Sequence, residues 1–138
     1  MTARQESRDT LTILLVEDDR LNQLFLRRLL EKQGYTVAVA NNGLEAVEQH
    51  RTGTFDCILM DIQMPLMSGV EATQEIRRNE PDGEHIPIIA VTAHTLPGDR
   101  QRFLAAGIDD VVGKPVPVPM ILEALHRVVQ QRLTGEER

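Results

Sequence analysis

The sequence predicts an α/β domain whose parallel sheet is covered by helices on both faces. Five short apolar segments with strand composition alternate with five segments whose apolar residues recur at helical spacing. This alternation is typical of parallel strands joined by right-handed crossover connections. The length of 138 residues suits a single domain. We expect a disordered lead-in over residues 1–10, the domain over 11–133 and a charged tail over 134–138.

The five strands are predicted where apolar residues form short runs bounded by polar or turn-forming residues. They are expected at 13–16, 36–40, 56–60, 86–91 and 111–112. Pro87 lies near the start of the fourth run, where a proline is tolerated.

The five helices are expected at about 21–33, 44–51, 70–78, 97–106 and 119–133. In the first, Leu21, Leu24, Phe25 and Leu29 form one apolar stripe, which we expect to face the core. The last has a longer buried stripe, consisting of Ile121, Leu122, Leu125, Val128 and Val129. The helix at 97–106 has only two large apolar residues, so it is expected to shift most easily.

Composition excludes several classes of protein. The net charge of −6 argues against nucleic acid as a direct partner. No apolar run approaches the ~20 residues of a membrane span, so we expect no membrane contact by this domain. Cys57 is the one cysteine, which rules out an intrachain disulfide and fits the cytoplasm. Aromatic residues make up 3% of the chain, so the core must be aliphatic.

Polar residues follow four of the predicted strands. Glu17, Asp18 and Asp19 follow the first, and Asp61 follows the apolar run of the third. The fourth ends in Thr92, and Lys114 follows the fifth. Because the carboxyl ends of parallel strands share one edge of a sheet, we expect these side chains to converge there.

The charges in this group indicate its chemistry. Two carboxylates ~4 Å apart repel by about 4 kcal/mol at an effective dielectric constant near 20. Lys114 supplies one positive charge, and a hard divalent cation, best Mg²⁺, would supply two more. A strand-end carboxylate can form an acyl-phosphate, with Thr92 donating a hydrogen bond to the phosphoryl group. The group therefore predicts phosphoryl transfer with Asp61 as the nucleophile.

Each residue alone has a simpler interpretation. Asp61 could cap the next helix, and the acids at 17–19 could cap the first one. Lys114 alone would be a surface lysine, and Thr92 a strand-end residue. His94 has no second histidine or cysteine at ligand spacing, which argues against a zinc site. The convergence of all four strand ends favours the phosphoryl-transfer interpretation.

The chain resembles a response regulator receiver domain of two-component signalling across about residues 11–133. The resemblance rests on four ordered segments, namely ILLVEDD at 13–19, MDIQMPLMSG at 60–69, IIAVTAH at 88–94, and GIDD at 107–110 leading to Lys114-Pro115. It implies a flavodoxin-like (βα)₅ fold with strand order 2-1-3-4-5.

The resemblance also implies roles for individual residues. Asp61 would be the phosphoacceptor, with Thr92 and Lys114 contacting the phosphoryl oxygens. Asp18 and Asp61 would bind Mg²⁺ through their carboxylates, Gln63 through its backbone carbonyl and Glu17 mainly through metal-bound water. The Lys114–Pro115 bond would be cis.

Several positions bear on how such a domain would switch. Val111 stands where many receivers have an aromatic residue whose rotation reports phosphorylation, and valine has no ring to rotate. Ser68 stands where Asp is common, with little expected effect on the chemistry. Gln63 and His94 lie two residues beyond Asp61 and Thr92, and we hypothesise that they set the lifetime of the aspartyl-phosphate.

Two other classes of function are considered. A phosphohydrolase of the haloacid dehalogenase type would need a general-acid Asp two residues after the nucleophile, where this chain has Gln63. A flavodoxin-like cofactor-binding module would need aromatic residues and a loop that accepts phosphate, which the acids at 17–19 would repel. Neither class matches the residues as well as a signalling phosphoacceptor that catalyses only its own phosphorylation and dephosphorylation.

The segments at 60–65 and 92–94 are most similar to receivers fused to hybrid histidine kinases. The expected partners are therefore a histidine kinase or a histidine phosphotransfer domain. The resemblance fits a cytoplasmic domain, on its own or as the cytosolic part of a membrane-bound kinase. It leaves open whether the domain is a monomer or a weak dimer through residues 97–133.

Overall fold

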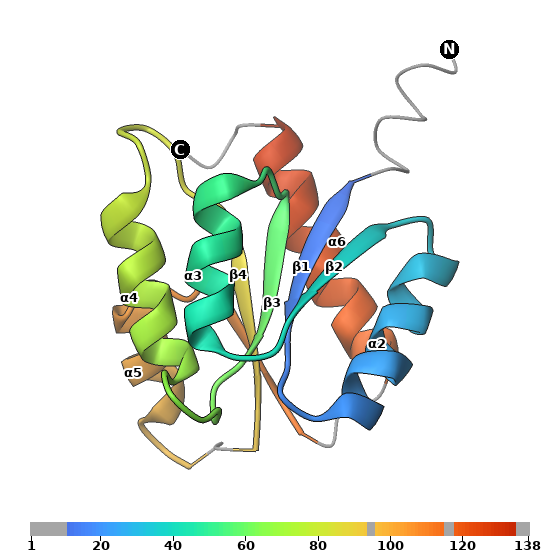
Figure 1. The fold of residues 1–138 in the computed structure, drawn as a ribbon, viewed down its shortest axis with the longest axis horizontal. Coiled ribbons are helices and arrows are strands. Elements are labelled where there is room, and N and C mark those ends of the chain that lie inside the picture. The colour runs from blue at the N-terminus through green and yellow to red at the C-terminus, as the bar shows by residue number, and fades with distance from the viewer. Residues whose placement is uncertain (1–10, 94–95, 115–117, 135–138) are drawn as a thin grey trace.

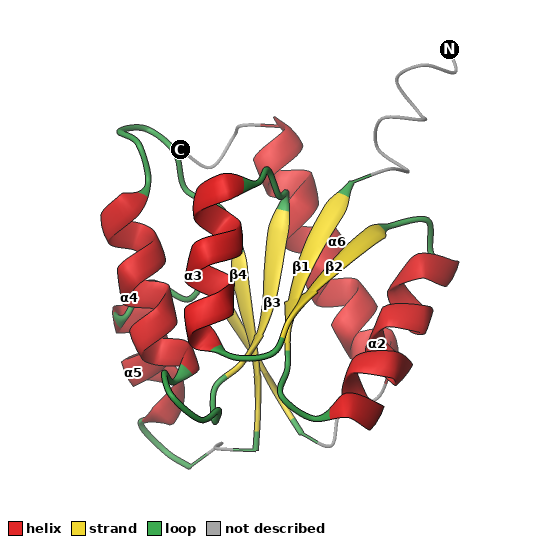
Figure 2. Ribbon diagram, in the orientation of Figure 1, coloured by secondary structure: helices red, strands yellow, loops and turns green. Residues whose placement is uncertain are grey.

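A five-stranded parallel sheet lies between two layers of helices (Figures 1 and 2). The structure is a computed structural model that describes residues 11–93, 96–114 and 118–134. The strand order is β2-β1-β3-β4-β5, which confirms the predicted fold class and order. The expectations for residues 1–10, His94, Pro115 and 135–138 lie outside the described residues.

All five strands form close to the predicted runs. They are β1 (Thr12–Val16), β2 (Thr36–Ala40), β3 (Cys57–Asp61), β4 (Ile88–Thr92) and β5 (Asp110–Gly113). Along the sheet, Val16 pairs with Met60, Asp61 with Val91, and Thr92 with Gly113. The strands therefore end at nearly the same level, and the residues that follow them meet at one edge.

Two helices cover one face of the sheet and three cover the other (Figure 1). The first pair is α2 (Arg20–Lys32) and α6 (Val118–Thr134), and the second layer is α3 (Gly43–Thr52), α4 (Gly69–Asn79) and α5 (Asp99–Ala105). None of the helices in the described part of the chain combines the length and apolar character that a membrane crossing requires.

The core is aliphatic, as the composition predicts. On the side of α2 and α6, Leu15 and Leu59 of the sheet share a cluster with Leu30 and Leu125 of the helices. On the other side, Met60 and Ile88 share a cluster with Ile76 of α4 and Phe103 of α5. Each strand supplies both clusters through alternate residues, so the sheet is buried on both faces.

The prediction of which side of α2 faces the core is wrong. Leu26 and Leu30 are the buried residues of this helix. Leu21, Leu24 and Phe25 are 75%, 47% and 57% exposed, and Leu29 is only partly buried. The helix carries apolar residues on two sides, and spacing alone does not say which side meets the sheet.

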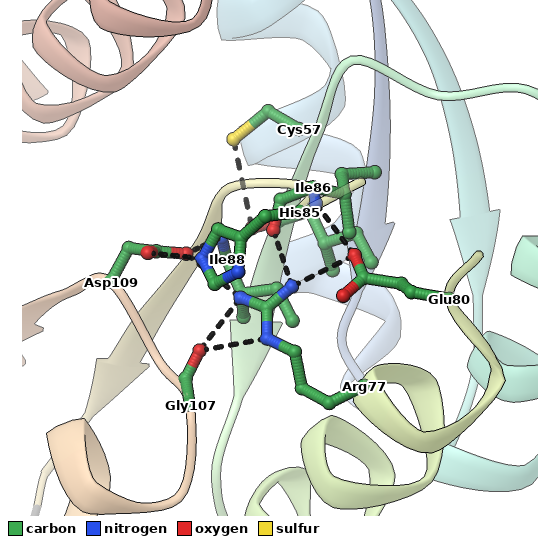
Figure 3. Close-up of polar contacts among 9 residues, drawn as sticks. Cys57, Arg77, Glu80, His85, Ile86, Ile88, Gly107 and Asp109 are labelled. Carbon is green, nitrogen blue, oxygen red and sulfur yellow. Dashed lines mark hydrogen bonds and ion pairs between the residues drawn. The ribbon is translucent and has the colours of Figure 1, made fainter. Parts of the chain in front are cut away.

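Arg77, near the end of α4, anchors the opposite edge of the sheet, where β4 and β5 begin (Figure 3). Its guanidinium donates to the backbone carbonyls of Ile86 and Gly107 and pairs with Glu80 at 3.0 Å and Asp109 at 2.9 Å. Asp109 also accepts from the backbone N–H of Ile88. One side chain therefore joins the end of α4 to the starts of two strands.

Candidate phosphoacceptor and metal site

Three carboxylates meet at the carboxyl edge of the sheet. Glu17 and Asp18 follow β1 directly, and Asp61 is the last residue of β3. Each offers an oxygen, and these oxygens all lie within 4.8 Å of one another. Glu17 is 3% exposed and Asp61 7%, while Asp18 is exposed. The predicted convergence of these three acids is therefore present in the structure.

The structure shows which of the acids cap helices. Asp19 is the N-cap of α2, and its carboxylate accepts the N–H of Asn22 at 2.9 Å. Ser68, seven residues after Asp61, is the N-cap of α4 and forms a capping box with Glu71. The capping interpretation is therefore correct for Asp19 and wrong for Asp61. The same short turn after β1 starts a helix with one acid and contributes the other two to the site.

Lys114 is the one basic side chain that the structure pairs with these acids within its described residues. Its Nζ lies 3.7 Å from Glu17 and 3.6 Å from Asp61. The backbone N–H of Lys114 donates to the carbonyl of Thr92 at 2.7 Å, which fixes the end of β5 against the end of β4. This backbone contact places the ammonium group beside the carboxylates.

The pKa values of Asp61 and Glu17 are both raised above their ordinary values, and burial is the main cause. Burial raises the pKa of Asp61, with Asp18 adding to the rise and Lys114 opposing it. Burial also raises the pKa of Glu17, against a backbone hydrogen bond from Asp19 that lowers it. Lys114 lowers both pKa values, but the effect of burial is larger.

The remaining predicted residues surround Asp61. Thr92 ends the neighbouring strand β4 and is 1% exposed. Gln63 is exposed, and its backbone N–H donates to Asp61 at 3.3 Å. Behind the loop, the backbone of Gly69 passes so close that an added Cβ would lie 2.5 Å from the carbonyl oxygen of Asp61. The loop from Asp61 to α4 therefore turns back tightly onto the strand end.

This donor set fits a hard divalent cation. Carboxylate oxygens gathered within a few ångströms, with raised pKa values and one amine nearby, match the oxygen coordination that Mg²⁺ prefers. Glu17, Asp18 and Asp61 are the side chains that could hold it, and the backbone of Gln63 lies next to them. The same charge would favour a phosphoryl group bound at Asp61.

Two features near the site were not predicted from the sequence. Gln23 of α2 donates from its side chain to the carbonyl of Glu17 at 2.5 Å and to Asn41 at 2.7 Å. Leu66 adopts a left-handed backbone with φ of 70°. A glutamine at position 23 gives no sequence signal, and a leucine at position 66 argues against the conformation that it adopts.

The chain matches the family model "Response regulator receiver domain" over residues 13–126. It is 43% identical over 120 residues to the Hybrid signal transduction histidine kinase I of Dictyostelium discoideum, covering 83% of this chain and 7% of that protein. It is 40% identical over 114 residues to the Polar-differentiation response regulator DivK of Brucella anthropi, covering 83% of this chain and 92% of that protein.

A solved structure with the same fold is the receiver domain of a sensor histidine kinase from Pseudomonas aeruginosa PAO1, which has a magnesium ion coordinated in its active-site cleft. It is 38% identical, with a TM-score of 0.80, and the match covers 88% of this chain and 98% of that one. The family match, the relatives and the clustered acids agree, and this chain belongs to the response regulator receiver domains of two-component signalling.

Proposed function

We propose that Asp61 accepts a phosphoryl group from the phosphohistidine of a partner protein, and that the change alters which partners the domain binds. The observation that carries this proposal is the placement of the Asp61 carboxylate, which is 7% exposed and lies 3.6 Å from the Lys114 ammonium. It also shares its edge of the sheet with two further acids. A carboxylate so placed can act as a nucleophile while cationic groups neutralise the incoming phosphate.

The proposed transfer exchanges an N–P bond for an O–P bond. A carboxylate oxygen of Asp61 attacks phosphorus, the O–P bond forms and the N–P bond to the histidine breaks. The histidine nitrogen keeps the electron pair of that bond and takes up a proton from water. Lys114 stabilises the negative charge on the phosphoryl oxygens, and the Thr92 hydroxyl donates a hydrogen bond to one of them. Later attack by water on phosphorus restores the free carboxylate.

A bound Mg²⁺ would supply positive charge for the phosphoryl oxygens and for the acids themselves. Asp18 and Asp61 would hold it through carboxylate oxygens, with Gln63 contributing its backbone carbonyl and Glu17 acting mainly through metal-bound water. Gln63, together with His94, would set how long the phosphate survives. The domain thus catalyses only its own phosphorylation and dephosphorylation.

We infer that the donor or acceptor partner is a histidine kinase or a histidine phosphotransfer domain, acting in the cytoplasm. The similarity to a hybrid histidine kinase supports this inference. The exposed apolar face of α2 also supports it, because Leu24 and Phe25 lie on the helix that begins two residues after Asp18. Such a face suits a helical partner that presents a histidine to the nearby site.

The test is incubation of the full chain with Mg²⁺ and acetyl phosphate, followed by intact mass measurement. The mass should rise by one phosphoryl group, and Asp61→Asn should abolish the rise.

Asp19→Asn is the matched control. It also removes one acid beside the site, but Asn caps a helix as well as Asp does, so phosphorylation should persist. A mass increase that survives in Asp61→Asn would show that the phosphoryl group is carried elsewhere.

A further inference from the structure

The most exposed apolar side chains gather around the edge that carries Asp61. Leu66, Leu21 and Leu96 are 76%, 75% and 70% exposed, the highest values among the large apolar residues that the structure describes. Leu21 follows β1, Leu66 follows β3 and Leu96 follows β4, so all three lie in segments leaving the carboxyl ends of strands. We refer to these three leucines as the apolar rim.

Besides its exposed side chain, Leu66 has a strained backbone conformation. Among the described residues it is the one non-glycine residue with a positive φ, at 70°, and the other positive φ values belong to glycines. An L-residue with a side chain rarely adopts this backbone, and glycine would adopt it without strain. Since the Leu66 side chain is largely exposed, packing within the domain does not compensate for the strain.

Two of the three segments that carry the rim are free of charge, whereas Leu21 directly follows the charged residues 17–20. Residues 62–68 contain no Asp, Glu, Lys or Arg, and neither do residues 92–98, in a chain that is 26% charged. At the opposite edge, the segment 80–86 carries three acids. Around Leu66 and Leu96, the rim therefore suits the apolar surface of a protein, and it offers little to a charged ligand.

We propose that Leu66 is a specificity-determining residue for phosphotransfer, contacting the phosphohistidine protein next to its histidine, with Leu21 and Leu96 on either side. This inference rests on the proposed function. The Asp61 carboxylate is nearly buried, so a protein that brings a histidine to it must cover the rim, whereas a small donor need not. Contact with the partner explains why a strained position holds a large, exposed aliphatic side chain.

The experiment compares a protein donor with a small donor for the same variants. The full chain replaces the matching segment of the Dictyostelium hybrid kinase named above, and transfer from the autophosphorylated kinase to the receiver is followed over time. In parallel, the free chain is phosphorylated with acetyl phosphate and Mg²⁺. Leu66→Asn should slow transfer from the kinase by about tenfold to a hundredfold, since a buried leucine contact is lost.

Four measurements separate this role from a structural one. Leu66→Asn should leave the acetyl phosphate rate unchanged and should not lower the Tm, because Asn tolerates a left-handed backbone. Leu66→Met, which keeps an apolar side chain, should retain most of the transfer. Leu104→Gln, at an exposed leucine near the end of α5 and away from the rim, should transfer like the wild type.

Unchanged kinase transfer in Leu66→Asn would overturn the inference and leave the proposed function standing. Equal losses with both donors would also overturn it, because they would mean that Leu66 only shapes the site. A wild-type receiver that accepts from acetyl phosphate but not from the kinase would show that the rim does not fit this class of partner. Failure with both donors would instead contradict the proposed function.

Discussion

The two edges of the sheet handle their charges in opposite ways. At the amino edge, where β4 and β5 begin, Arg77 pairs with Glu80 and Asp109, and Asp110 pairs with Arg127. Hydrogen bonds from Arg127 and Val111 hold the pKa of Asp110 below its usual value despite burial. At the carboxyl edge, burial instead raises the pKa values of Glu17 and Asp61.

The charges of the amino edge therefore serve the stability of the fold, and those of the carboxyl edge form the candidate site. At the amino edge, Glu80, Asp109 and Asp110 each pair with an arginine, so these charges stabilise the fold. The carboxyl edge keeps an excess of negative charge, which costs stability and leaves room for a cation and a phosphoryl group. Four measurements test this contrast.

The largest effect is expected at the amino edge. Arg77→Ala should lower the free energy of unfolding by about 3 kcal/mol, because it leaves the nearly buried Glu80 and two carbonyls without their partner. Urea denaturation measures the change. Arg27→Ala is the control, since Arg27 forms an exposed pair with Glu31 within α2 and should cost less than about 0.5 kcal/mol. A loss below about 1 kcal/mol in Arg77→Ala would contradict a structural role for this edge.

The next effect is stabilisation by metal. At a Mg²⁺ concentration ten times its dissociation constant, the free energy of unfolding should rise by about 1.4 kcal/mol. Thermal unfolding in EDTA and in MgCl₂ measures it, with CaCl₂ and NaCl for comparison. The increase should disappear in Asp18→Asn combined with Asp61→Asn. If the double variant responds like the wild type, the metal binds elsewhere.

A smaller effect is expected from removing one acid of the site. Without metal at pH 7, Asp61→Asn should raise the free energy of unfolding, by on the order of 1 kcal/mol, because it removes the cost of burying a carboxylate beside two other acids. The corresponding change at the other edge, Asp109→Asn, should lower it, since Asp109 pairs with Arg77. If both variants change the free energy of unfolding in the same direction, the two edges do not differ as described.

The smallest effect is the dependence on pH in metal-free buffer. The pKa of Glu17 is raised from 4.5, so the folded state favours its protonated form. The stability of the wild type relative to Glu17→Gln should therefore fall as pH rises above 4.5 and level off above the raised value.

Asp110 should show the opposite trend. Its pKa is lowered from 3.8, so its contribution is complete above that pH and is lost as pH falls through the lower folded value. Urea unfolding of wild type, Glu17→Gln and Asp110→Asn between pH 3 and 7 compares the two trends. Parallel pH profiles for both variants would contradict them.

The sequence predicts the carboxyl edge better than the amino edge for a physical reason. Strand ends are marked by an abrupt change from apolar to polar residues, and a parallel sheet brings those ends together, so Glu17, Asp18, Asp61 and Lys114 could be assigned to one site. Arg77 lies on a helix between other charged residues, and its partners are backbone carbonyls and acids up to 32 residues away. Helical spacing predicts that Arg77, unlike Arg78, lies on the side of Thr73 and Ile76, but no local pattern identifies its partners.

The face of α2 shows a second limit of sequence reasoning. Leu21, Leu24 and Phe25 of the predicted apolar stripe are exposed, and Leu26 and Leu30 are the buried residues of this helix. Periodicity detects an apolar face, whether that face meets the core or a partner. The wrong prediction is therefore itself informative, because an apolar face that the fold does not use is available to another protein.

The order of the strands has a consequence for how the domain acquires its site. β1 lies between β2 and β3, and its pairing with β3 joins Ile13 to Cys57. The candidate site is complete only when Lys114, which directly follows the last strand, reaches Asp61. Non-local parallel pairings form slowly because loop closure precedes the gain from contacts. During synthesis, the three acids would be translated long before the lysine that partly balances them. The site of the proposed phosphotransfer would thus form late in folding.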